Sequence, residues 1–370
     1  MKILHLSHST LEDWRIIKSA ISSSKFDNDV YFCGMKSFSY PNIFKKQYQV
    51  IWTAKARWGI PYYWYAVKKQ IKKILDELRP DIIHAHNIYA AKMASEFDIP
   101  FVYNDHEHWI KYAKIIAEVS KSKNETNKIK SVLRKGLKQY GIYLCAKWEK
   151  EILSKNPTIT VSDRIANDLK DLVKTSKIFV IPNFPQKQEI VDLLPPKLSK
   201  EISCVYQGRD GYNIDFLPHK NFDGLIEFFQ NNDLGELTFV GWKNGSTDKI
   251  KYTGLLSRKE MFLAMAQHSI GLLPWHKHWS HYYLNPNKAF EYAHSGSFLI
   301  CTSSLETVKD ILKDNCDTIE NYNDLKSKLL YYKQNLNELY SKRLKIYEFA
   351  RKNLIWENYE DNIKMAYNAI

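Results

Sequence analysis

Short apolar runs alternate with helical patterns along the chain, and this alternation constrains the fold more than any other feature. The runs are rich in β-branched residues and are apolar throughout rather than at every second position. Continuous apolar strands joined by helices are typical of a parallel sheet covered on both faces. The predicted strands are 2–6, 29–33, 81–85, 100–104, 157–161 and 177–181, then 201–207, 236–241, 249–253, 269–273, 297–302 and 317–320.

A proline-rich segment, residues 181–201, interrupts the pattern, which then starts again. At 370 residues the chain is longer than one ordinary core, which favours two domains. We therefore predict an α/β fold with two Rossmann-like domains that face each other across a cleft, and one or two amphipathic helices over 341–370. The predicted helices are 62–78, 88–96, 127–153 and 163–173, then 221–231, 257–267, 286–294, 304–313 and 323–336.

The composition argues against a membrane-spanning or secreted protein. No apolar run reaches the length of about 18 residues that a transmembrane helix needs. The start, MKILHLSHS, is expected to form a buried strand rather than a signal peptide. The five cysteines are scattered without a CxxC pair, which favours a reducing cytoplasm and predicts neither a zinc site nor a disulfide framework.

The net charge of +13 is concentrated partly in residues 55–75, a block that contains both lysines and the aromatic residues tryptophan and tyrosine. Two interpretations stay open for this block. Its aromatic side chains fill the core of a solvated helix, or its lysines and aromatics meet the headgroups of an anionic membrane. Nucleic acid is not expected as a partner, because no stacking motif or helix-turn-helix pattern accompanies the charge.

The segment NPNKAFEYAHSG, residues 285–296, is predicted to be a short helix. Asn285 is the expected cap, with Pro286 at the first helical position and Gly296 at the end. The buried stripe of this helix would be Ala289, Phe290 and Ala293.

The opposite side of this helix carries Asn287, Lys288 and Glu291 next to the positive end of the helix dipole. Such an end binds phosphate, and a carboxylate one turn deeper can accept two hydrogen bonds from a ribose diol. The alternative is a surface Lys–Glu pair that contributes only a few tenths of a kcal/mol, roughly.

Other charged residues and glycines follow or precede predicted strands and helices of the second half. Gly208 and Arg209 come directly after a strand, and Lys220 precedes a helix. Arg209 and Lys220 can bind one diphosphate, the arginine through two parallel hydrogen bonds. Gly241 ends another strand and would let a ligand approach the backbone. Two cations and a helix dipole would neutralise a diphosphate without a metal.

Taken in order, these and other motifs resemble the retaining GT-B glycosyltransferases of family 4, the glycosyl transferases group 1. The resemblance covers nearly the whole chain, and its most specific element is PNKxFEY followed by glycine. The motifs are HAHN (84–87), NDHEH (104–108), VSD (161–163), IPN (181–183), QGR to KNFDGLI (207–226), FVG (239–241), YTGLLSRKEM (252–261) and NPNKAFEYAHSG (285–296).

The resemblance implies domains of residues 1–183 on the acceptor side and 184–350 on the nucleotide-sugar side, with a C-terminal helix, 351–370, that packs back on the first domain. It implies transfer of a sugar from a nucleotide diphosphate to an acceptor hydroxyl with retention, in cell-surface or lipid-linked glycan assembly. Arg209, Lys220 and the helix dipole would stabilise the leaving diphosphate. No cofactor or metal is expected, and the nucleotide-sugar is the substrate.

The resemblance also assigns roles to particular residues. Glu291 would hold the donor ribose, and His106 would lie beside the transferred sugar. Gly241, Asn287 and Lys288 would complete the donor site, while Ser9, His84 and His86 would lie on the acceptor side. The enzyme would be cytoplasmic, and residues 55–75 would attach it peripherally to the inner face of a membrane.

Two departures from the family pattern keep other functions open. Tyr283 stands where many relatives carry a glutamate, and HSTLEDW (8–14) replaces a glycine pair. The alternatives are a nucleotide-sugar epimerase of the same fold and a non-catalytic nucleotide-sugar-binding partner. A dinucleotide oxidoreductase is not expected, because no GxGxxG follows the first strand.

Two segments have the appearance of metal sites, and we expect neither to bind metal. DND (27–29) precedes a strand and is predicted to be a turn. PWHKHWSHYY (274–283) holds three histidines without a cysteine or glutamate at ligand spacing, and is expected to shape the sugar pocket rather than bind zinc.

Overall fold

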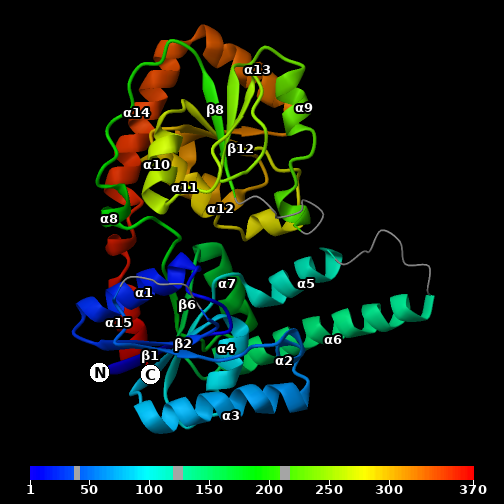
Figure 1. Cartoon of the computed structure of the whole chain (residues 1–370), viewed down its shortest axis with the longest axis vertical. Coiled ribbons are helices and arrows are strands. Elements are labelled where there is room, and N and C mark those ends of the chain that lie inside the picture. The colour runs from blue at the N-terminus through cyan, green and yellow to red at the C-terminus, as the bar shows by residue number, and fades with distance from the viewer. Residues whose placement is uncertain (37–41, 120–127, 209–216) are drawn as a thin grey trace. The chain divides into compact units, whose positions relative to one another are not determined.

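The structure is a computed structural model that describes residues 1–36, 42–119, 128–208 and 217–370. The chain divides into two compact units, each built on one parallel sheet (Figure 1). Unit 1 is Met1–Pro182 together with Tyr359–Ile370, and unit 2 is Asn183–Asn358. The predicted α/β class with two Rossmann-like domains and a returning C-terminal helix is confirmed.

Unit 1 has a seven-stranded sheet in the order β3-β2-β1-β4-β5-β6-β7. Strand order reverses between β1 and β4, and this is the position at which open α/β sheets bind ligands. The strands are β1 (Lys2–Ser7), β2 (Asp29–Gly34), β3 (Lys46–Gln49), β4 (Ile82–His86), β5 (Phe101–Asn104), β6 (Thr158–Thr160) and β7 (Ile178–Val180). The helices are α1 (Trp14–Lys25), α2 (Ala54–Arg57), α3 (Pro61–Leu78), α4 (Asn87–Ala94), α5 (Trp109–Val119), α6 (Lys128–Leu153), α7 (Asp163–Leu172) and α15 (Asp361–Asn368).

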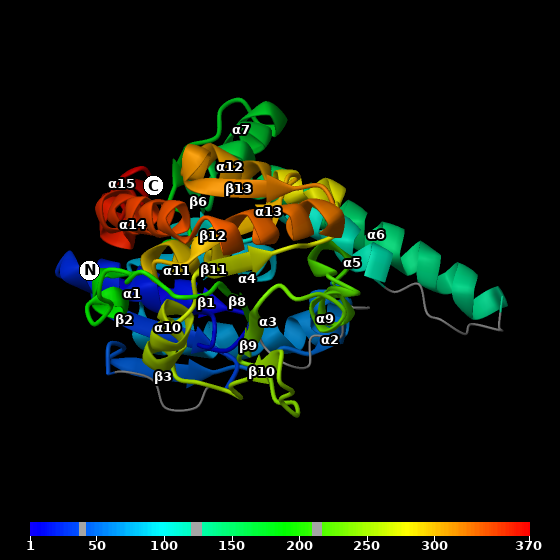
Figure 2. The same ribbon diagram turned by 90° about the horizontal axis from the view of Figure 1, so that it is seen from above.

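Alternate side chains of the unit 1 strands face opposite sides of the sheet. On one side Leu4, Leu6, Ile83 and Ala85 join a core with α3, α4 and α6. His5, His84 and His86 are the intervening residues of β1 and β4, and they face the side that α1 and α15 cover. Helices α5 and α6 run side by side and extend beyond the sheet (Figures 1 and 2).

Unit 2 has a six-stranded sheet in the order β10-β9-β8-β11-β12-β13, with its reversal between β8 and β11. The strands are β8 (Ser203–Gln207), β9 (Glu236–Val240), β10 (Ile250–Tyr252), β11 (Ile270–Leu273), β12 (Phe298–Thr302) and β13 (Cys316–Ile319). The α-helices are α8 (Lys187–Ile190), α9 (Leu225–Gln230), α10 (Arg258–Ala266), α11 (Asn287–His294), α12 (Glu306–Leu312), α13 (Tyr322–Gln334) and α14 (Leu336–Asn353). Short 3-10 turns are η2 (Pro218–Lys220), η3 (Trp279–Tyr282), η4 (Lys313–Asn315) and η5 (Trp356–Asn358).

Each predicted strand overlaps an observed strand, but β3 was not predicted. Its sequence, KQYQ, is polar and mostly exposed, because β3 lies at the edge of the sheet and contributes little to the core. None of the helices in the described residues is long and apolar enough to cross a membrane.

Candidate functional site

The helix that follows the carboxyl end of β11 is α11, and it begins one residue later than expected. Pro286, in extended conformation, occupies the cap position, and no side chain caps the helix, so the prediction of an Asn285 cap is wrong. The predicted stripe of Ala289, Phe290 and Ala293 is buried as expected. Gly296 ends this segment with a φ of +66°, a conformation that favours glycine.

Glu291 is buried and held by an arginine from another helix. Its side chain is 2% exposed, and Arg258 Nη1 donates to its Oε1 at 2.5 Å. Arg258 also donates from Nε to Glu189 Oε1 at 2.7 Å. The alternative of a surface Lys–Glu pair is therefore wrong for Glu291, whose ion-pair partner is Arg258.

Arg258 is a candidate site residue that the sequence analysis missed. Ser257 caps α10 and forms a capping box with Glu260, which fixes Arg258 at the first helical position. Burial alone lowers the pKa of Arg258, but Glu291 and Glu189 outweigh it and raise the pKa above its ordinary value. The serine followed three residues later by glutamate, in LLSRKEM, was a signal for this helix start.

Lys288 and Lys220 bring two positive charges together beside the end of β8. Lys288 Nζ donates to Gln207 Oε1 at 3.3 Å. Burial and the nearby charge of Lys220 lower the pKa of Lys288 to about 8, against the opposing effect of Glu291. A bound anion would favour the charged form of this lysine, so this position is suited to a negatively charged ligand.

Gly241 allows two strand ends to approach closely, and its predicted role in donor binding stays a prediction. A Cβ at Gly241 would lie 2.1 Å from the carbonyl oxygen of Gly208, and Gly241 has a φ of +94°. Asn287, at the first position of α11, is exposed. Arg209 lies outside the described residues, so its predicted contact with a diphosphate stays a prediction.

In unit 1, the last residue of β4 and residues that follow β1 and β5 meet at the reversal of strand order. His106 Nδ1 lies 2.9 Å from Asp13 Oδ2, and His106 Nε2 lies 3.2 Å from His86 Nδ1. The structure thus brings His86 and His106, which come from separate motifs, within hydrogen-bond distance of each other. Asp13, which caps α1, is a further member that the sequence analysis did not identify.

His84 and Ser9 have local partners. His84 Nε2 accepts a hydrogen bond from Asn104 Nδ2, and its Nδ1 contacts the hydroxyl of Tyr367 on α15 at 2.8 Å. This pairing ties the last helix to β4, so His84 connects two parts of unit 1. The Ser9 hydroxyl lies 2.9 Å from that of Ser7, at the end of β1.

The segments 274–283 and 27–29, which have the appearance of metal sites, were expected not to bind metal. His281 Nε2 donates to the carbonyl of His219, and its Nδ1 contacts Ser304 Oγ. His276 contacts the carbonyl of Asp223. Asp27, in the DND segment, has a φ of +58° in the turn between α1 and β2.

Among the described residues, His5, His84 and His86 each place one ring nitrogen within 4.8 Å of the others. The ring planes lie at 21–22° to one another, and within this group His5 Nδ1 and His86 Nε2 are 3.0 Å apart, which is a hydrogen-bond distance.

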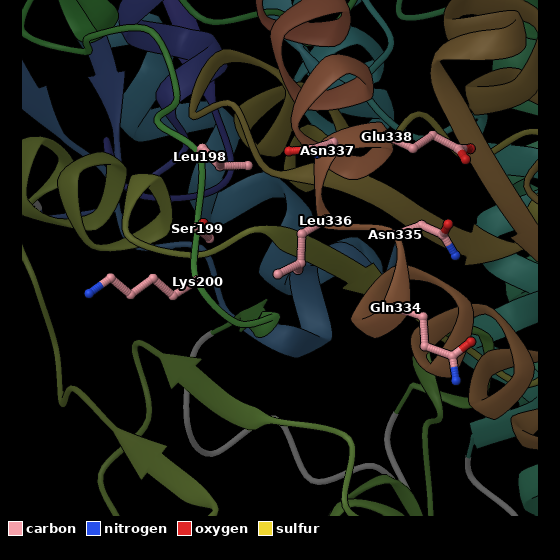
Figure 3. A pocket seen from close by; sticks show the side chains of 8 residues that line it. All are labelled: Leu198, Ser199, Lys200, Gln334, Asn335, Leu336, Asn337 and Glu338. Atoms are coloured by element: carbon pink, nitrogen blue, oxygen red, sulfur yellow. The ribbon is translucent and has the colours of Figure 1, made fainter.

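A surface pocket of about 670 Å³ in unit 2 lies away from these residues. It is formed by Leu198–Lys200, before β8 begins, and by the junction of α13 and α14 (Figure 3). It therefore lies toward the amino ends of the strands, whereas ligands in α/β sheets bind at the carboxyl ends.

Comparison with known proteins agrees with this architecture. Residues 28–185 match the model of Glycosyltransferase Family 4. No curated protein matches the sequence of the chain.

Solved structures match over the full length at low sequence identity. Sucrose-phosphate synthase from Thermosynechococcus elongatus has a TM-score of 0.74 at 12% identity, over 100% of this chain and 99% of that one. HepE from Anabaena, in complex with UDP-glucose, has a TM-score of 0.66 at 11% identity, over 100% of both chains. WaaG, a glycosyltransferase involved in lipopolysaccharide biosynthesis, has a TM-score of 0.59 at 14% identity, over 98% of this chain and 99% of that one.

The resemblance stated from the motifs is thus confirmed, apart from retention, which stays a prediction: the chain has the GT-B fold of the glycosyltransferases, and residues 28–185, which lie in unit 1 except for the last three, match Glycosyltransferase Family 4.

Proposed function

We propose that this protein is a glycosyltransferase that moves a sugar from a nucleotide diphosphate to an acceptor hydroxyl. The observation that carries the proposal is the surroundings of α11. Its first turn holds Lys288 beside Lys220, and one turn deeper the buried Glu291 is fixed by Arg258. Two cations suit a diphosphate, and a fixed carboxylate suits a ribose diol.

The proposed chemistry needs charge stabilisation more than a nucleophile. As the sugar leaves, negative charge grows on the diphosphate, and Lys220, Lys288 and the first turn of α11 are suited to stabilise it. We propose that the reaction proceeds with retention by attack on the front face, with the leaving phosphate taking the acceptor proton. We propose no metal for this step, because the cations of the chain balance the charge. Arg209 is predicted to add to them.

The donor is best identified by calorimetry with UDP-, GDP-, ADP- and dTDP-sugars. A uridine nucleotide is the first to test, since the GT-B protein HepE was solved with UDP-glucose. We expect one donor to bind, and Glu291→Ala to weaken its binding by roughly ten- to a hundredfold, as for loss of a charged hydrogen bond. Glu227→Ala, on the exposed surface of α9, is the matched control and is expected to bind like wild type.

Binding of no nucleotide, or equal binding by Glu291→Ala, would contradict the proposed donor site. Turnover of the bound donor then separates the reaction classes. A transferase forms a glycoside with an acceptor, an epimerase releases an isomerised nucleotide-sugar, and a binding partner leaves the donor unchanged.

We further propose that the enzyme works at the cytoplasmic face of a membrane on a lipid-linked glycan. Residues 55–75 were expected either to place their aromatic side chains in the core or to meet a membrane, and on α2 and α3 some aromatic side chains are buried while others are exposed. Trp64 packs against Trp52 and Trp148 in the core. Trp58, Tyr62 and Tyr65 are 44%, 76% and 67% exposed, and the exposed Lys69, Lys72 and Lys73 follow on α3. Exposed aromatics with lysines are suited to anionic headgroups.

This membrane proposal predicts a selective loss of activity. Changing Lys69, Lys72 and Lys73 to Glu should lower activity with acceptor in anionic vesicles, since each lysine near such a surface contributes about 1 kcal/mol. Lys68 is best left unchanged, because its ion pair with Glu96 at 3.0 Å is partly buried, whereas the pair of Lys72 with Asp76 is exposed. Activity with a soluble acceptor should stay at the wild-type level, and equal loss in both assays would contradict membrane attachment.

A further inference from the structure

Four side chains of unit 1 form a continuous row of hydrogen-bonding groups. Asp13 Oδ2 lies 2.9 Å from His106 Nδ1, His106 Nε2 lies 3.2 Å from His86 Nδ1, and His86 Nε2 lies 3.0 Å from His5 Nδ1. His5 and His86 are fully buried, and His106 is nearly so. The row therefore runs from the loop after β1 into the interior of the sheet.

The exposed end of the row sets the direction of its first hydrogen bond. Burial raises the pKa of Asp13, but the His106 ring, the backbone N–H of Arg15 and the Arg15 charge outweigh it and bring the pKa to about 2. Asp13 is therefore ionised at neutral pH and accepts only. His106 must carry a proton on Nδ1 to donate to it.

The buried end of the row sets the direction of the others. His5 Nε2 has no partner among the described residues. If His106 also donated from Nε2, His86 would have to donate to His5, and His5 would hold an unpaired N–H in the interior. A buried donor without an acceptor is rare and costly, so the favoured arrangement has His5 donate to His86 and His86 donate to His106.

This arrangement keeps His5 and His86 neutral and prevents proton relay. Burial lowers the pKa of His5 to about 3, and burial with the neighbouring rings lowers the pKa of His86 well below its ordinary value. No proton source contacts His5 Nε2 in the described residues, so the row cannot pass a proton outward. Both ring nitrogens of His106 are occupied by protein partners.

We propose that His5 and His86 are positioning residues that hold His106 as the Nδ1–H tautomer, so that the Asp13 carboxylate, and not an imidazole nitrogen, meets a sugar hydroxyl. Asp13 is the accessible member of the row, with 34% of its side chain exposed against 6% for His106. A carboxylate is an acceptor suited to a hydroxyl. The identification of the ligand as a sugar rests on the function proposed above, whereas the assignment of the tautomer does not.

The tautomer is tested on the full chain by nitrogen NMR of the histidine rings, which distinguishes a protonated from a bare ring nitrogen. We expect Nδ1–H on His5, His86 and His106 in the wild type. His86→Asn places an amide donor near the position of Nδ1 and should keep His106 Nε2 a bare acceptor. His86→Leu removes the donor and should free Nε2 to carry a proton, while Asp13 still holds the proton on Nδ1. A proton on His106 Nε2 in the wild type, or an unchanged His106 signal in folded His86→Leu, would overturn the proposal.

The role of Asp13 is tested by sugar transfer or donor hydrolysis. Asp13→Asn should lower kcat/KM by roughly ten- to a hundredfold, as for a lost charged hydrogen bond, while donor binding to the Glu291 site persists. The matched control is Asp27→Asn, in the exposed turn after α1, which should keep wild-type kcat/KM. Wild-type kcat/KM in Asp13→Asn would overturn the assignment of Asp13. Failure of every nucleotide to bind would instead refute the proposed function and leave the NMR result to decide the tautomer.

Discussion

At the scale of single residues, the pKa of Lys288 gives the proposed donor site a pH dependence. This pKa is about 8 in the free protein. A bound diphosphate stabilises the charged form and raises it, so binding takes up a proton when the pH is above 8. Affinity for a nucleotide-sugar should therefore be constant below pH 8, and should fall by up to about tenfold per pH unit above it until the pKa of the complex is reached.

Calorimetry between about pH 7 and about pH 9, in two buffers of different ionisation enthalpy, measures both the affinity and the proton uptake. Lys288→Arg is the control, because arginine stays charged throughout this range and should remove the pH dependence. An affinity of the wild type that stays constant across the range would show that Lys288 does not meet the diphosphate.

The candidate residues that could be predicted from sequence lie within single motifs. Lys288 and Glu291 share one short helix, and their helical spacing was visible in NPNKAFEY. Arg258 and Glu189 were not found, because the hydrogen bonds of Arg258 to Glu189 and to Glu291 join segments that only the fold brings together. Asp13 was missed for the same reason, since its partner His106 follows a strand far along the chain.

At the scale of elements, the start of α10 positions Arg258 and through it Glu291. The Ser257 hydroxyl accepts from the Glu260 backbone N–H, and the Glu260 carboxylate accepts from that of Ser257. Ser257→Ala should lower the free energy of unfolding by about 1 kcal/mol and weaken donor binding, because Arg258 occupies the first helical position. Chemical denaturation and calorimetry measure the two effects.

Ser257→Asp is the matched variant, because aspartate is an equally good helix cap. It should restore both stability and donor binding. If Ser257→Ala lost stability but bound the donor like wild type, the position of Arg258 would not depend on this cap.

Elements buried on both faces were the ones that the sequence could predict. A buried parallel strand is apolar throughout, as in FLICT of β12, and so stands out from its surroundings. The edge strand β3 does not, because KQYQ faces solvent and is specified by its pairing with β2 rather than by its own composition.

At the scale of the whole molecule, the end of the chain completes the unit in which the chain began. Tyr367 of α15 lies with its hydroxyl 2.8 Å from His84 Nδ1 and 2.7 Å from Ser23 Oγ. The Ser23 hydroxyl donates to the carbonyl of Ser19, so Tyr367 donates to Ser23 and accepts from His84. Glu360, just before α15, pairs with Lys25 at 3.0 Å. Unit 1 is therefore incomplete until the last residues are in place.

Tyr367→Phe leaves the buried Nδ1–H of His84 without an acceptor, and this should destabilise unit 1 by about 1–3 kcal/mol. Amide hydrogen exchange separates the two units. Protection should fall in β4 and β5 of unit 1 but stay unchanged in β11 and β12 of unit 2, because protection follows the stability of each cooperative unit. Met365→Ala, at an exposed position on the same helix, should leave both units unchanged. Equal loss of protection in both sheets would mean that the two units unfold as one, and that α15 stabilises the whole chain rather than the sheet it covers.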